Sequence, residues 1–143
     1  MTARNPLRRL LRLREIREDQ ARAALAAASR SARAAAEVLE ARTEEHHARP
    51  ALPETLSPAQ LRGLMLQGVR SYELITAAAE VYDQALGQAA VARRGWSAAS
   101  SELRSAEKLE QRRRQEADRT DQTAAERALD ELVLTLRNLR QWI

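Results

Sequence analysis

The feature that most constrains the fold is a regular spacing in which steps of three and four residues alternate from Met65 to Leu103. Most of these positions are apolar or glycine, and Arg93 and Ser100 are the clearest exceptions. A period of about 3.5 residues keeps one stripe facing a partner along a supercoiled helix, so the pattern predicts a coiled coil. The positions are Met65, Gly68, Tyr72, Ile75, Ala79, Tyr82, Leu86, Ala89, Arg93, Trp96, Ser100 and Leu103.

A second apolar ridge with the same spacing lies near the end of the chain. Its members are Leu129, Leu132, Leu136, Leu139 and Ile143. No proline follows Pro58, whereas an ordinary amphipathic helix of a globular bundle would show stop signals after roughly ten to twenty residues. We therefore predict one long helix over about 71–142.

A first helix is predicted over about 7–47. Leucine recurs along its inward stripe, and alanines fill many of the positions between, which lets a partner helix approach closely. Such a stripe buries little area per turn and is marginal without a partner along its length. The stripe consists of Leu11, Arg14, Glu18, Ala21, Leu25, Ala28, Ala32, Ala35 and Leu39.

The segment 48–70 is predicted to reverse the chain. Three prolines between residues 50 and 58 end the first helix. Ser57 and Gln60 have the spacing of a capping box, so a short helix is expected to follow. The sequence thus predicts an all-α fold: one elongated two-helix antiparallel coiled-coil hairpin over residues 1–143, a single domain with a short helix or loop at the tip.

Residues suited to chemistry are scarce. The chain has no cysteine, and its two histidines, His46 and His47, point to different faces of a helix, so we predict no metal site and no cofactor. No glycine-rich phosphate loop or hydrolase signature occurs. A slim coiled coil has little concave volume for a substrate. We therefore predict a protein that is not an enzyme and has no small-molecule partner.

The positive charge is concentrated at one end. The net charge is +4, and residues 1–17 alone carry +5, with six arginines against Glu15, so the rest of the chain sums to −1. Proteins that bind nucleic acid usually show a basic face along the fold, with aromatic residues for stacking if they bind single strands. Because aromatic residues make up 3% of the chain, we predict no nucleic-acid partner. No apolar run approaches the roughly 18 residues that a membrane span requires.

Three stretches carry a resemblance to a known family. The arginine- and leucine-rich start from Leu7 to Glu15 runs directly into a long alanine-rich helix. The stretch from Ala106 to Arg114, EKL followed by RRR, precedes the LDE stretch from Glu126 to Glu131. Together with the length, the connector before mid-chain and the absence of cysteine, they resemble FliJ. This is the small coiled-coil stalk and export chaperone of the bacterial flagellar type III secretion apparatus.

The resemblance implies a function and a set of partners. It implies an antiparallel hairpin like the rotor stalk of rotary ATPases, which docks into the ring of the export ATPase FliI. It also implies contact with the export gate protein FlhA and handling of export chaperones. The expected location is the cytoplasm, with peripheral attachment to the export apparatus at the inner membrane through these partners, in a role in flagellum biogenesis and chemotaxis.

Two regions are the candidate protein-binding sites. By resemblance to the gate-binding end of the family, the tip candidates are Leu39, Arg42, Tyr72, Ile75, Ala79 and Tyr82. The first helix has no aromatic residue there, which departs from the family, and the four candidates of the second helix could instead be core between the helices. The second region combines the basic start with the C-terminal ridge. Its candidates are Arg8, Arg9, Arg12, Leu132, Leu136, Leu139 and Arg140.

The difference in helix length supports the second region. At about 1.5 Å per residue, a first helix of 7–47 ends opposite roughly residue 112 of the second. The polar segment 107–123 then faces water, and the apolar ridge beyond it is uncovered. An uncovered apolar stripe normally marks a binding surface, so we expect this part to enter a partner such as the ATPase ring.

Three alternatives stay open. The nearest is the equivalent stalk of an injectisome, the YscO-like group. An unrelated scaffold that homodimerises through its leucine ridge belongs to a different class, and an arginine-rich nucleic-acid binder is the third.

Overall fold

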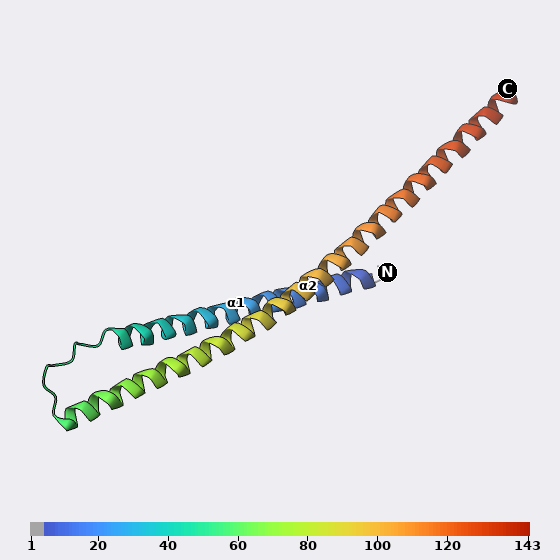
Figure 1. The fold of residues 1–143 in the computed structure, drawn as a ribbon. Helices are drawn as coiled ribbons and strands as arrows, with labels where there is room; N and C mark the ends of the chain where they lie inside the picture. Colours follow the sequence, from blue (N-terminus) through green and yellow to red (C-terminus); the bar gives the residue numbers. More distant parts are fainter. Residues whose placement is uncertain (1–4) are drawn as a thin grey trace. The chain divides into compact units, whose positions relative to one another are not determined.

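The fold consists of two helices. The computed structural model describes residues 5–143, and in this range it contains α1 (Pro6–His47) and α2 (Pro58–Gln141) and no strand. Residues 48–57 join them (Figure 1). The predicted all-α class and the two-helix hairpin are confirmed.

Local sequence signals set where each helix begins. The side-chain oxygen of Asn5 accepts a 3.1 Å hydrogen bond from the backbone N–H of Leu7, and Pro6 takes the first helical position, where it loses no hydrogen bond. At the second helix, the Ser57 hydroxyl accepts from the Gln60 N–H at 3.2 Å, and the Gln60 side chain accepts from the Ser57 N–H at 3.0 Å. This reciprocal pair is the predicted capping box.

The start of the long helix differs from the prediction. The connector is 48–57 and α2 begins at Pro58, not near residue 71. The short helix expected after the prolines is the first part of α2, since Gly63 and Gly68 have no positive φ and the helix runs through them. Ser71 does not restart the helix; its hydroxyl lies 3.0 Å from Nδ1 of His46 on α1.

The chain divides into two compact units, which are described separately. The first covers 17–100, where α1 and the first half of α2 lie side by side and run in opposite directions (Figure 1). Three contacts establish the antiparallel register of this unit. They join Glu18 to Trp96, His46 to Ser71, and Arg49 to the backbone carbonyl of Gln67.

The core of this unit is made of alanines. Ala32 and Ala35 of α1 and Ala85 of α2 are each no more than 8% exposed, and Tyr82 packs against them. Alanine side chains are short, so the two helices must approach closely to bury them. All nine positions predicted for the inward stripe of α1 are buried or half-buried, so this prediction is confirmed.

The predicted stripe of α2 is correct at alternate positions. Gly68, Ile75, Tyr82, Ala89, Trp96 and Leu103 are half-buried as expected. At three levels between them, the buried or half-buried residue lies one position earlier than predicted. The structure places Ser71, Ala85 and Ala92 inward where Tyr72, Leu86 and Arg93 were predicted, whereas the predicted Ala79 is half-buried next to the buried Ala78. The alanine-lined gap accepts a small side chain at these levels, and the bulkier neighbour turns outward.

The second unit contains α1 up to Ile16 and residues 101–143. Arg14 forms an ion pair with Glu102, and Ala106 and Glu110 are 6% and 5% exposed. The Glu110 carboxylate accepts hydrogen bonds of 3.1 Å from Arg113 and 3.3 Å from Arg114. From residue 111 to residue 143 every residue is exposed, in agreement with the predicted end of pairing near residue 112.

Candidate functional site

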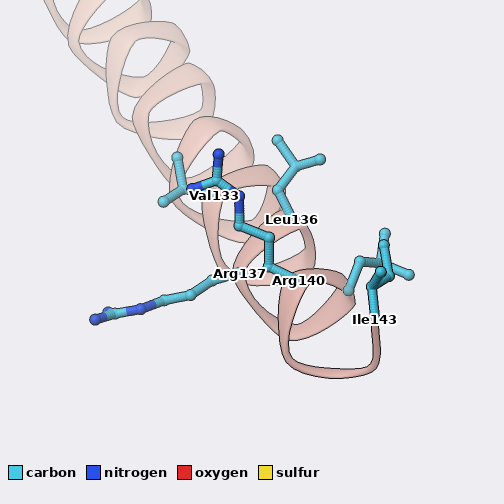
Figure 2. A pocket seen from close by; sticks show the side chains of 6 residues that line it. Val133, Leu136, Arg137, Arg140 and Ile143 are labelled. Atoms are coloured by element: carbon cyan, nitrogen blue, oxygen red, sulfur yellow. The ribbon is translucent and has the colours of Figure 1, made fainter.

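The C-terminal apolar face is an exposed apolar surface of the second unit. It comprises Leu129, Leu132, Val133, Leu136, Leu139 and Ile143, each more than half exposed. Figure 2 shows Leu136 and Ile143 on one side of the helix, while the Arg137 side chain extends away from it. A shallow groove between Val133 and Ile143 is edged by Arg137 and Arg140. The face therefore combines an apolar stripe with two cations.

The structure places the predicted residues of this region at the surface. Leu132, Leu136 and Leu139 lie on the C-terminal apolar face, and Arg140 lines the same groove. Arg8, Arg9 and Arg12, at the start of α1, are also exposed. All seven candidate side chains are thus accessible to a partner.

A second apolar surface, the tip stripe, lies at the start of α2. Leu61, Met65, Val69 and Tyr72 are 48%, 64%, 55% and 67% exposed. Their spacing of three and four residues puts them on one face of the helix. Of these four, the sequence-based site contained only Tyr72, because Leu61, Met65 and Val69 lie in the predicted connector 48–70. The signal was present in the spacing and was hidden by the assumed break before Ser71.

The other tip candidates are less accessible than Tyr72. Leu39, Arg42, Ile75, Ala79 and Tyr82 are all half-buried. Tyr82 packs on the alanine core, and the Arg42 guanidinium pairs with Glu45 at 3.1 Å. The structure therefore does not bring the six candidates together as one exposed patch; Ile75 and Tyr82 lie in the predicted α2 stripe, and Tyr72 faces outward.

A third surface, the interhelix groove, was missed. It is lined mainly by Ser31, Ala34, Val38, Leu74, Ala77 and Val81, with Arg42 at one end. Val38, Leu74 and Val81 are about half exposed. The spacing from Leu74 to Ala77 and Val81 is the signal that could have revealed it.

Two buried carboxylates, Glu18 and Glu110, have lowered pKa values because of the hydrogen bonds that they accept. The Glu18 carboxylate is 4% exposed, and it accepts hydrogen bonds from the Trp96 indole at 2.9 Å and the Arg22 guanidinium at 2.7 Å. The indole hydrogen bond, followed by that from Arg22, lowers the pKa of Glu18 below its usual range. The pKa of Glu110 is lowered in the same way, first by the hydrogen bond from Arg113.

The described residues offer neither a cluster of metal ligands nor a membrane span. In the range 5–143, no three His, Cys, Asp or Glu side chains cluster so that they could hold a metal ion. Neither α1 nor α2 has a segment both long and apolar enough to cross a membrane. The surfaces that the structure offers are apolar faces on helices, which are suited to binding other proteins.

Comparison with known protein families also points to a helical protein that works by binding other proteins. The model of the flagellar FliJ protein family matches residues 3–141. This chain belongs to the FliJ family. FliJ proteins are non-catalytic components of the flagellar protein export apparatus, so the chain is a component of that apparatus. No curated protein and no solved structure matches it significantly.

Proposed function

We propose that this FliJ-family chain is a non-enzymatic stalk and chaperone of flagellar export, which binds the ring of the export ATPase FliI, the gate protein FlhA and export chaperones. Its location in this proposal is the cytoplasm, at the inner-membrane export apparatus through its partners. The family match favours the flagellar system over an injectisome and over an unrelated scaffold. The observation that carries the proposal is the uncovered C-terminal apolar face.

The C-terminal apolar face suits insertion into a ring. Residues 111–143 are exposed on all sides of the helix in the single chain, so no other part of the described chain has to move away before a partner surrounds this segment. When a partner covers the leucines, each Å² of apolar surface removed from water stabilises the complex by about 25 cal/mol. Arg137 and Arg140 at the edge of the groove, and the exposed Arg8, Arg9 and Arg12, are available for carboxylates of the ring.

The tip stripe is the proposed contact with the gate. Met65 and Tyr72 are its most exposed members. Methionine adapts its shape to a partner, and tyrosine offers a large apolar ring with a polar end, so both are common at protein interfaces. Leu39, Arg42, Ile75, Ala79 and Tyr82 support the tip stripe from the adjoining helix interface in this proposal.

A truncation after Thr123 tests the ATPase contact. It removes the C-terminal apolar face and no residue that is buried in the described structure. We expect an unchanged melting temperature, measured by circular dichroism, and loss of binding to the purified ATPase. If truncation unfolds the hairpin, the C-terminal apolar face is structural and the proposal fails.

A reciprocal pair of variants separates the two contacts. Met65→Ser combined with Tyr72→Ser changes the tip stripe, and Leu132→Ser combined with Leu136→Ser changes the C-terminal apolar face. We expect the first pair to lose gate binding and keep ATPase binding, and the second pair to do the reverse. Loss of both partners in either double variant, with helicity retained, would contradict the assignment of one surface to each partner.

A further inference from the structure

The charges along residues 124–143 are arranged by sign. Glu126, Asp130 and Glu131 outweigh Arg127 in the first half, which is therefore net acidic, and Arg137 and Arg140 make the second half basic. A second copy of this segment that runs in the opposite direction therefore brings each acidic half against a basic half. This complementarity does not exist when two copies run in the same direction.

The apolar residues follow the same symmetry. With Leu129 and Leu136 at a positions of a heptad, Leu132 and Leu139 take the d positions. An antiparallel alignment centred on Leu134 places Leu129 opposite Leu139 of the second copy, and Leu132 opposite Leu136 of the second copy. Each leucine is at least 56% exposed in the single chain, so all four layers gain burial.

The flanking positions support this alignment. Glu126 and Arg140 are both e positions, next to the leucine core, and the alignment brings Glu126 of one copy beside Arg140 of the other. Both are exposed, and neither has an ion-pair partner among residues 5–143. The g positions place Trp142, which is 90% exposed, beside the small Ala128. A parallel alignment instead brings Glu126 beside Asp121, which is repulsive.

From this pattern we propose that the C-terminal apolar face binds a second copy of this chain as an antiparallel helix pair. Stable interfaces bury at least about 1,000 Å² in total. Six side chains of the face on each of two copies, all more than half exposed, supply roughly that area, so the dimer forms with low affinity. The face is the one that the proposed function assigns to the ATPase, and the dimer keeps it covered until that partner binds.

The test is the oligomeric state of the full chain, measured by analytical ultracentrifugation up to about 100 µM, a concentration at which a dissociation constant of micromolar order gives mostly dimer. Glu126→Arg and Arg140→Glu each create two repulsive contacts and should weaken dimerisation at least about tenfold. The double variant restores opposite charges and should restore the dimer. Glu131→Arg, on the outer side of the helix, is the matched control and should leave the affinity unchanged. Circular dichroism at each step shows that helicity is retained.

Three outcomes would overturn the proposal: a monomer at the highest concentration, no recovery in the double variant, or a tighter dimer with Glu126→Arg alone, which indicates parallel pairing. The measurement contains no ATPase, so its result does not depend on whether the proposed function holds. ATPase binding that fails while the dimer forms would reject the proposed function and leave this inference intact.

Discussion

The indole N–H of Trp96 on α2 donates a 2.9 Å hydrogen bond to the Glu18 carboxylate on α1. This contact lies in an interface that otherwise consists largely of alanine. A buried carboxylate is costly unless it is hydrogen-bonded. A slip in register would leave Glu18 without the indole, so the contact favours one alignment of the two helices.

Trp96→Ala should destabilise the hairpin by roughly 2–4 kcal/mol, because it removes a large side chain from the interface and a donor from Glu18. The measurement is urea unfolding followed by circular dichroism. Trp142→Ala is the matched control, since Trp142 is 90% exposed, and it should leave stability unchanged. A loss below about 0.5 kcal/mol for Trp96→Ala would show that the ring contributes little to this interface.

Acid should weaken the hairpin. The lowered pKa of Glu18 means that the unfolded chain takes up a proton at higher pH than the folded chain does. The stabilisation is therefore complete above the unfolded pKa of about 4.3 and is lost as pH falls through the lower folded value. The melting temperature should fall on acidification below about pH 5, and it should fall less in Glu18→Gln. An identical decrease in both proteins would show that Glu18 is not responsible.

Ala85→Leu should destabilise the chain by about 1–3 kcal/mol, because the larger side chain does not fit the closely packed alanine core. Ala85 is 5% exposed and lies against Ala32 and Ala35. The control is Ala90→Leu at an exposed position of the same helix, where leucine has nearly the same helix propensity and little effect is expected. If the two variants melt alike, the helices are farther apart than the structure shows.

Gly63→Ala should stabilise the first turns of α2 by about 0.5–1 kcal/mol, because alanine loses less backbone entropy than glycine in a helix. A Cβ at Gly63 meets nothing within 4 Å, whereas at Gly68 it would lie 3.2 Å from Nη1 of Arg49. Gly68→Ala should therefore gain less, since Arg49 must move. The measurement is amide hydrogen exchange over residues 58–70. Slower exchange in Gly68→Ala than in Gly63→Ala would contradict the predicted order of the two variants.

Much of the fold could be predicted from the sequence because the relevant signals are local. The spacing of Leu25, Ala28 and Ala32 is sufficient to identify the inward stripe of α1, and Ser57 with Gln60 identifies the start of α2. The candidate C-terminal residues, such as Leu132 and Leu136, were found because leucine recurs at steps of three and four residues from Leu129 to Leu139. The tip stripe was largely missed because the break assumed before Ser71 placed Leu61, Met65 and Val69 in a connector and not on one helix face.

The sequence by itself determined the helical class, the position of the reversal and the apolar ridge, since helix periodicity, proline and capping act within a few residues. Only the tertiary structure decided which of two neighbouring side chains on α2 faces α1. Ala78 and Ala85 lie inward while Tyr72 and Leu86 lie outward. The physical reason is the distance between the helices, which depends on both stripes together: alanines on α1 allow a close approach, and that gap accepts small residues from α2 and turns the larger ones towards solvent.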